Sequence, residues 1–278
     1  MGRLTDFLQP SHRALDLGSG GHGSFPLGPA SAILADEAVP AAPPGPFVAC
    51  RAEALPFASG SFDVVVAAHC LEHFARLPAA LAEVRRVLKP ACALYVSIPD
   101  ASTLTDRLYR WMYSGGGHVN RFDDLADAVR LIGNATGLEV RSIRRLYSSL
   151  HPLRREMVRR LPRRRRYLFP GLPPSVLSLL LAILSLADRL FGARLSVYGW
   201  EMHFDRLGFL GPVCAAEEGL VCSNCGFAIS DEWLQHSRAL EGLRPARLTY
   251  RCRQCGCLNF RRFTPPSRMM DTKLCRNA

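Results

Sequence analysis

The feature that most constrains the fold is a glycine-rich turn that follows a short apolar run near the amino terminus. The run "RALDLG" has the length and composition of a buried strand, and the turn continues as "SGGHG". Gly18, Gly20 and Gly21 have no Cβ atom, so the backbone of this turn can approach a bound molecule closely. A strand that ends in such a turn is typical of α/β sheets, which bind ligands beyond the carboxyl ends of their strands.

Further apolar runs predict the rest of the sheet. The segments "SAILAD", "PGPFVAC", "FDVVVAAHC", "ALYVSIP", "LEVRSIRRLY" and "YGWEMHFDRLGF" are each interpreted as a strand. Apolar residues at 77, 81, 84 and 88 recur at helical spacing up to Pro90, and a second amphipathic helix ends at Gly137. Prolines between the first two strands leave room for only a short crossover helix. This alternation predicts a doubly wound parallel sheet within residues 1–210.

The charge of the chain is unevenly distributed. Residues 1–140 carry a net charge of −3 and residues 141–278 a net charge of +14. The second half is therefore expected to meet an acidic partner, such as nucleic acid, anionic lipid or a phosphorylated substrate, unless these charges form only a solvated surface. The first ten residues do not have the pattern of a secretory signal, which favours a cytoplasmic protein.

Two cofactor classes fit the glycine turn. The spacing G-x-G-x-x-G occurs in dinucleotide sites, but these place the pyrophosphate on a helix that begins directly after the turn, and here the chain continues as "SFPLGP". S-adenosylmethionine has no phosphates and needs a close backbone and a carboxylate for its ribose hydroxyls. Asp36 lies 20 residues after Asp16, at the end of the second apolar run, and its carboxylate suits either cofactor.

Three downstream runs carry a resemblance to a known family. "AEALPFASGSFDVVVAAHCLEHF", "ALAEVRRVLKP" and "LYVSIPD" resemble the type-11 group of class I S-adenosylmethionine-dependent methyltransferases in content, order and spacing. The resemblance covers roughly residues 10–145 and the strand near 198–206. It implies a Rossmann-like sheet of seven strands, the last of them antiparallel, with S-adenosylmethionine over the first, second and fourth strands.

The same resemblance implies the contacts of the cofactor. The methionine end is expected beside Asp16, Gly18, Ser19, Gly20 and Gly21, the ribose beside Asp36, and the adenine beside Ala52 and Glu53. His69, at the end of the fourth strand, is expected to face the methyl group.

Histidines are the candidates for a general base, which helps only where the acceptor holds its proton tightly. His69 ends a strand at the expected mouth of the site, and the alternative is that it only caps the strand. His118 follows "SGGG", a stretch suited to a substrate lid, and the alternative is a surface histidine. His73 is a third candidate, but Glu72 and His73 match the family's "LEH", which favours a structural role in holding the next helix.

The C-terminal part contains four cysteines in two C-x-x-C pairs at the separation of a zinc ribbon: Cys222, Cys225, Cys252 and Cys255. Four thiolates predict a closed, structural Zn²⁺ whose binding folds a module over residues 218–264, followed by a tail at 265–278. A redox pair or unpaired thiols are the alternatives, and the adjacent Cys257 is a competing ligand candidate.

Residues 147–195 form an insert of unusual composition. Arginines cluster from Arg154 to Arg166, and an apolar run follows over Val176–Ala187. This run is shorter than the roughly 20 residues that span a bilayer, so we expect helices that either cap the site as a substrate lid or lie in a membrane interface. The arginines suit anionic lipid headgroups or RNA phosphates, although few aromatic residues interleave with them.

The sequence therefore predicts a methyltransferase with a zinc ribbon, acting on a small-molecule acceptor or a lipid- or saccharide-linked one, and peripheral at an anionic membrane surface. One alternative is an RNA methyltransferase that grips its substrate through the ribbon and the arginines. Another is a catalytically silent binding protein of the same fold. Arg51, where the family has an acid, and Ala91-Cys92, where it has glycines, favour the silent alternative.

Overall fold

The computed structural model describes two parts of the chain. The first is residues 8–210, apart from 21–22, 25–26, 28–29, 114–116, 148–149, 160 and 170. The second consists of short stretches further on, at 218–222, 228–230, 240–241, 249–252, 256 and 258–260. Gly21, Cys225, Cys255 and Cys257 lie outside the described residues.

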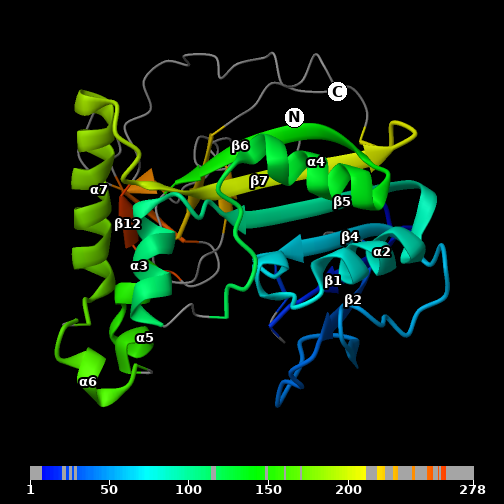
Figure 1. The fold of residues 1–278 in the computed structure, drawn as a ribbon, viewed down its shortest axis with the longest axis horizontal. Helices are drawn as coiled ribbons and strands as arrows, with labels where there is room; N and C mark the ends of the chain where they lie inside the picture. Colours follow the sequence, from blue (N-terminus) through cyan, green and yellow to red (C-terminus); the bar gives the residue numbers. More distant parts are fainter. Residues whose placement is uncertain are drawn as a thin grey trace.

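The architecture is an α/β sheet of nine strands in the order β3-β2-β1-β4-β5-β7-β6-β8-β9 (Figure 1). Its strands are β1 (Arg13–Leu17), β2 (Ser31–Asp36), β3 (Phe47–Ala49), β4 (Phe62–Ala68), β5 (Leu88–Pro99), β6 (Glu139–Tyr147), β7 (Val197–Arg206), β8 (Glu218–Val221) and β9 (Ala228–Ser230). A second sheet of three short strands contains β10 (Leu240–Glu241), β11 (Thr249–Arg251) and β12 (Leu258–Phe260).

Strands β1 to β5 pair in parallel, and β7 is antiparallel to both β5 and β6. The antiparallel last strand of the methyltransferase-like part is therefore confirmed. The count of seven strands is wrong, because β8 pairs in parallel with β6 and β9 pairs with β8. Strand β6 would otherwise leave its backbone groups unpaired at the sheet edge. The segment expected to begin a separate ribbon thus extends the main sheet.

The helical elements are the 3₁₀ turn η1 (Leu71–His73), α2 (Leu77–Val87), α3 (Leu104–Met112), α4 (Leu125–Thr136), the 3₁₀ turn η2 (His151–Leu153), α5 (Arg155–Arg159), α6 (Arg163–Arg166) and α7 (Pro174–Phe191). Helix α4 begins where the Asp124 side chain accepts the Asp127 N–H and ends, as predicted, at Gly137 with φ +69°. Helix α2 ends at Val87, earlier than Pro90 predicts, because Leu88 already pairs with Phe62 as the start of β5.

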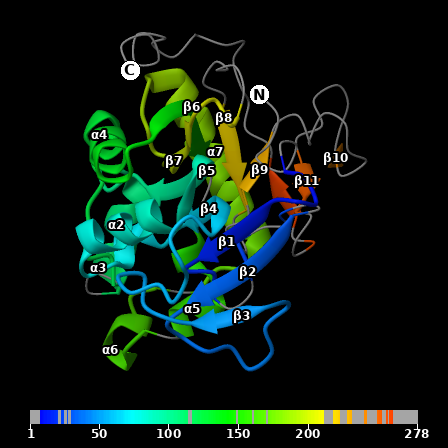
Figure 2. The same ribbon diagram turned by 90° about the vertical axis from the view of Figure 1, so that its right-hand side faces the viewer.

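Helices α2 and α4 lie side by side on one face of the sheet (Figure 2). Leu81 and Ile132 bury their side chains there against the strands. The other face is covered by Leu8, Leu27 and Leu210. These three residues are not helical, so the expected helices on both faces are found on only one face among the described residues. The prolines of the β1–β2 crossover explain this, because they disfavour a covering helix.

The insert lies beyond the carboxyl ends of the parallel strands. Strands β4 and β5 end on the side where α3 and α7 stand (Figure 1). Leu177 and Leu181 of α7 are buried with Leu108 of α3, and α7 also contacts β12. The insert therefore covers the edge at which sheets of this kind bind ligands. Across the described part of the chain, no helix combines the length and apolarity needed to cross a membrane.

Candidate active site

The glycine turn after β1 has the backbone conformation that only glycine adopts easily. Gly18 and Gly20 have φ +68° and +59°. The Gly18 N–H donates to the Ala35 carbonyl of β2 at 2.8 Å. A Cβ at Gly18 would lie 2.4 Å from the Cβ of Cys70, whereas a Cβ at Gly20 would meet no atom within 4 Å. Gly18 is thus required by packing against Cys70, while Gly20 borders open space.

Asp36 ends β2 directly beside this turn. Its Oδ2 accepts the Gly20 N–H at 2.8 Å and its Oδ1 accepts the Ala38 N–H at 2.9 Å. The side chain is half-buried, and a carboxylate accepts about four hydrogen bonds, so both oxygens keep acceptor capacity. A diol such as that of a ribose fits this group, and the site matches the expected S-adenosylmethionine in its donor and acceptor chemistry.

Asp16 and Ser19 are buried inside the glycine turn, whereas Asp36 is only half-buried. Asp16 is buried, and its two carboxylate oxygens accept the N–H and the hydroxyl of Ser24, both at 2.6 Å. Burial raises the pKa of Asp16 above its ordinary value. Ser19 is also buried, and its N–H donates to the Ala35 carbonyl at 3.3 Å. Both residues therefore shape the turn, and their contact with a cofactor stays a prediction.

The predicted adenine contacts follow β3. Ala52 is buried in the core, and the Glu53 side chain is 6% exposed. Arg51 Nε lies 3.6 Å from Glu53 Oε2, so the arginine that replaces the family's acid forms an ion pair with the next acid along the chain. The adenine contacts of Ala52 and Glu53 stay predictions.

The two catalytic candidates line one cavity of about 120 Å³ at the carboxyl edge. His69 follows β4, and His118 comes from the loop after α3. The remaining lining residues are Glu72, His73, Pro99, Thr105, Asp106, Tyr109, Pro152 and Tyr198. Cys70, which packs against Gly18, is adjacent in sequence to His69. The cavity therefore adjoins the glycine turn.

His69 has a backbone conformation that is uncommon for a residue with a side chain. Its φ is +53°, and its N–H donates to the Ser97 carbonyl at 2.9 Å. Its Nδ1 lies 3.3 Å from the Tyr198 hydroxyl and 4.0 Å from Glu72 Oε1. Burial raises the pKa of Tyr198 far above its usual range, so the phenol stays protonated and keeps its O–H. Outliers of this kind occur at functional sites more often than elsewhere.

His118 is held firmly in the cavity wall. Its Nδ1 lies 2.9 Å from Asp106 Oδ1, and its side chain is 10% exposed, so it is not a surface histidine. Arg110 binds the other oxygen of Asp106 at 2.5 Å and donates to the His118 carbonyl at 2.7 Å. Burial alone would raise the pKa of Asp106, but the hydrogen bonds from His118 and Arg110 outweigh it and lower the pKa.

Glu72 and His73 also face this cavity, although the sequence pattern favoured a structural role for them. Glu72 is buried, and its Oε2 has no hydrogen-bond partner among the described residues. Burial, followed by the charge of Asp106, raises the pKa of Glu72 to about 8. His73 Nδ1 lies 2.9 Å from the Gly117 carbonyl, and partial burial lowers its pKa. The signal in the sequence was the run "HCLEH", which places two histidines and a glutamate directly after a strand.

The described half of the predicted zinc site is buried. Cys222 and Cys252 belong to one packed cluster with Tyr147 and Tyr250. The Asn259 side-chain amide donates to Cys222 Sγ at 3.4 Å, and Gly256 N–H donates to the Cys252 carbonyl at 2.8 Å with φ +68° at Gly256. A buried sulfur that accepts a hydrogen bond has chemistry consistent with a thiolate ligand, so these residues fit the expected metal.

Comparison with known proteins bears on the cofactor side of the site. Residues 27–96 match the family described as "Methyltransferase domain". The chain is 37% identical over 102 residues to the biotin biosynthesis bifunctional protein BioHC of Cellvibrio japonicus. It is 51% identical over 51 residues to the ubiquinone/menaquinone biosynthesis C-methyltransferase UbiE of Paraburkholderia phymatum. These matches cover 35% and 18% of this chain, and the chain spans only 20% and 21% of the two relatives.

Solved structures with a similar course of the chain include two S-adenosylmethionine-dependent methyltransferases. One, from Methanosarcina mazei, has a TM-score of 0.43 and 17% identity over 73% of this chain and 96% of that chain. The other, from Archaeoglobus fulgidus, has a TM-score of 0.44 and 14% identity over 70% of this chain and 86% of that chain. The similarity to the methyltransferase family is thus confined to residues 27–96.

Proposed function

We propose that this protein transfers a methyl group from S-adenosylmethionine to a small-molecule acceptor or a lipid- or saccharide-linked one. The observation that carries the proposal is the meeting of the Gly18–Gly20 turn and the Asp36 carboxylate at the carboxyl edge of the sheet. Asp36, β3 and β4 lie within residues 27–96, which match the methyltransferase family. The cavity proposed for the acceptor is lined by His69, and the next residue, Cys70, packs against Gly18 of the turn.

Different residues are proposed to contact different parts of the cofactor. Gly18 and Gly20 bring the backbone close to the cofactor, and Asp36 accepts hydrogen bonds from its ribose hydroxyls. S-adenosylmethionine, when bound, supplies a methyl group on a positively charged sulfur. The protein contributes alignment and exclusion of water, and the insert over the carboxyl edge serves both.

His69 is the proposed general base in the acceptor cavity. The Tyr198 hydroxyl beside its Nδ1 orients the ring, and the buried Glu72 lies on the same side. His118 lines another part of the cavity, where Asp106 holds its ring. An acceptor that loses a proton on methylation would pass it to His69, and removal of such a base typically costs about 100-fold or more in rate.

The acceptor class is supported by the cavity and by the outer surface of the insert. A space of about 120 Å³ admits the reacting group of a larger molecule, and Tyr109, Tyr198 and the prolines give it apolar walls. The name of the relative UbiE describes that protein as a C-methyltransferase of ubiquinone and menaquinone biosynthesis.

Helix α7 exposes its apolar side chains. Val176, Leu179, Ile183, Leu186 and Leu190 recur every three or four residues and are 43–65% exposed. This spacing places them on one side of the helix, away from the buried Leu177 and Leu181.

Two polar residues of α7, Ser185 and Asp188, lie inside. Ser185 is buried, and Asp188 accepts hydrogen bonds from the Leu195 and Ser196 N–H groups at 2.6 and 2.8 Å. Arg163 and Arg164 of the neighbouring α6 are exposed. An apolar stripe beside exposed arginines favours an anionic membrane surface as the partner.

Transfer of tritiated methyl groups to fractionated lipid, saccharide and RNA extracts tests the activity and the acceptor class. The His69→Ala variant should lose at least about 100-fold in turnover at saturating cofactor, while His12→Ala, at a half-buried histidine outside the cavity, should not. Labelling of RNA alone would overturn the proposed acceptor. A chain that binds the donor and labels nothing would be a silent fold.

Flotation with phosphatidylglycerol vesicles tests the membrane surface. The Ile183→Asp variant should release the protein, whereas Val39→Asp, at a 72% exposed valine on another segment, should leave binding intact. Equal binding by both variants, or equal binding to neutral vesicles, would refute this docking mode.

We further propose a structural Zn²⁺ held by Cys222, Cys225, Cys252 and Cys255. Support comes from the burial of Cys222 and Cys252 and from the Asn259 amide that donates to Cys222 Sγ. The Cys222→Ser variant should lose one equivalent of thiolate-bound zinc. A variant that keeps its zinc would contradict this ligand set.

A further inference from the structure

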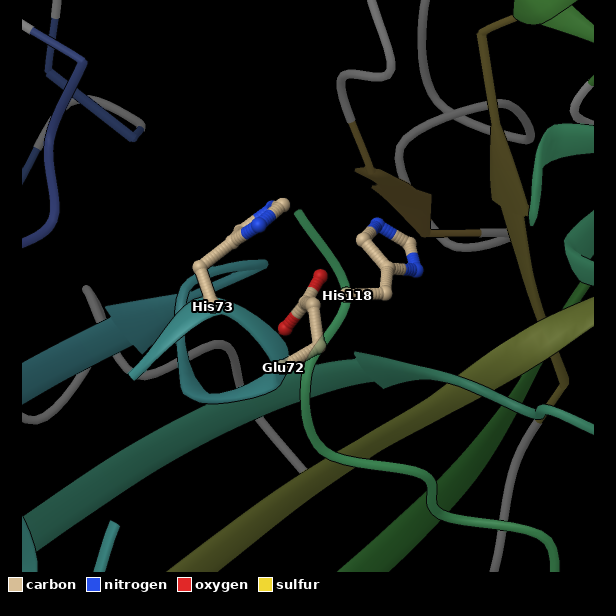
Figure 3. A group of neighbouring side chains, drawn as sticks. All are labelled: Glu72, His73 and His118. Atoms are coloured by element: carbon tan, nitrogen blue, oxygen red, sulfur yellow. The ribbon is translucent and has the colours of Figure 1, made fainter. Parts of the chain in front are cut away.

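Three side chains that can ligate a metal gather in the acceptor cavity: Glu72, His73 and His118 (Figure 3). One ligand atom from each lies within 4.8 Å of the other two. Two tetrahedral ligands of one Zn²⁺ lie about 3.4 Å apart, given bonds of about 2.1 Å. Side-chain movements of about 1 Å would therefore close the set around one ion. Glu72 and His73 come from the turn η1, and His118 from a loop 45 residues later.

The two imidazole rings are oriented for ligation by their Nδ1 contacts. The Gly117 carbonyl can only accept a hydrogen bond, so the proton of His73 lies on Nδ1. The Asp106 carboxylate fixes the same tautomer in His118. Both rings therefore keep the lone pair on Nε2. A carboxylate or carbonyl on the second nitrogen is the usual outer partner of a metal-bound histidine.

Glu72 supplies the carboxylate, whose Oε1 lies 4.0 Å from His69 Nδ1. In Figure 3 its carboxylate lies between the two imidazole rings. The residue is 2% exposed, and no described residue hydrogen-bonds to its Oε2. Arg110, the nearby cation, is bound to Asp106 instead. A buried carboxylate normally has a partner for its charge, and a cation at this position would be that partner.

We propose that Glu72, His73 and His118 bind a divalent first-row transition-metal ion such as Zn²⁺. Two imidazoles and one carboxylate suit Zn²⁺, Co²⁺ or Fe²⁺, whereas Mg²⁺ and Ca²⁺ prefer sites made of oxygen atoms. His73 is exposed, which gives an ion access from solvent. Three protein ligands leave at least one coordination position for water or an acceptor oxygen.

The open position has a consequence that rests on the proposed methyl transfer. A metal ion lowers the pKa of a bound hydroxyl group, so an acceptor that coordinates through oxygen would be deprotonated next to His69. This narrows the acceptor to a compound with a hydroxyl or enol group at the methylated end. The metal site itself does not depend on the methyltransferase activity.

Titration of the metal-stripped full chain with Co²⁺ tests the site, because thiolate ligands give a charge-transfer band and nitrogen and oxygen ligands do not. The wild type should bind one equivalent without that band, in addition to any bound by the cysteines. His73→Ala and His118→Ala should each lose this equivalent, and His12→Ala should keep it. Asp106→Asn should weaken it by about 10–100-fold, as expected for an outer partner of a ligand.

The isosteric Glu72→Gln variant decides the matter if an alanine variant fails to fold by circular dichroism, and it should also lose the equivalent. A wild type that binds only thiolate-ligated Co²⁺, or variants that all bind like the wild type, would overturn the site. A chain that binds S-adenosylmethionine but not this ion refutes the metal site alone. A chain that binds the ion but no donor refutes the proposed function alone.

Discussion

Replacement of Asp36 tests the cofactor site most directly. Of the roughly four hydrogen bonds that its carboxylate can accept, two are made by the Gly20 and Ala38 N–H groups, so two remain for the two hydroxyls of a ribose. A hydrogen bond to a charged group contributes about 1.5–3 kcal/mol, and the lower value applies here because the side chain is half-exposed. Asp36→Ala should therefore lose about 3 kcal/mol of binding free energy, which raises Kd for S-adenosylmethionine about 100-fold.

The assay is isothermal titration calorimetry with S-adenosylmethionine and with its demethylated product. Glu37→Gln is the matched control, because it removes the same charge from the neighbouring exposed residue and should bind within about twofold of the wild type. Circular dichroism establishes that both variants are folded. The reasoning is refuted if Asp36→Ala binds as tightly as the wild type. Equal weakening in Glu37→Gln would show that long-range charge, rather than a contact, determines the affinity.

Two other predictions concern stability. Gly18→Ala should destabilise the fold by at least about 2 kcal/mol in urea unfolding, because the new Cβ would lie 2.4 Å from Cys70 at a φ of +68°; an unchanged midpoint would contradict the packing. His203 is buried near Glu201 and Arg144, and burial lowers its pKa to about 4. In the unfolded chain His203 binds a proton below about pH 6.5, whereas in the folded chain it binds one only below about pH 4. The free energy of unfolding should therefore fall by up to about 3 kcal/mol as the pH drops from 6.5 to 4. His203→Gln should lose less stability over this range than the wild type, and equal losses would place the titrating group elsewhere.

The strands and helix ends near the cofactor site could be read from the sequence because their signals are local. "RALDLG" is a strand that ends in a turn of positive φ, and Gly137 ends α4 in the left-handed conformation. Asp36 lies beside the turn, as the 20-residue spacing from Asp16 indicated. Apolar runs and glycines report the chain's own backbone preferences, which do not depend on distant residues.

Three features depended on contacts between distant segments. The sheet has nine strands because β8 pairs with β6 and β9 pairs with β8. No local sequence pattern predicts this pairing. Helix α7 buries Ser185 and Asp188 together with Leu177 and Leu181 while it exposes an apolar stripe, because Asp188 binds the backbone at 195–196.

His118 meets Glu72 and His73 because the loop after α3 is hydrogen-bonded to the turn after β4: Asn120 donates to the Leu71, Glu72 and Phe74 carbonyls, and the Gly117 carbonyl lies against His73 Nδ1. The sequence by itself determined strands β1 to β7, the glycine turn and the candidate ligands, since each is a property of a short segment. Only the tertiary structure decided which of those side chains share a cavity, because that depends on the paths of loops held by hydrogen bonds far along the chain.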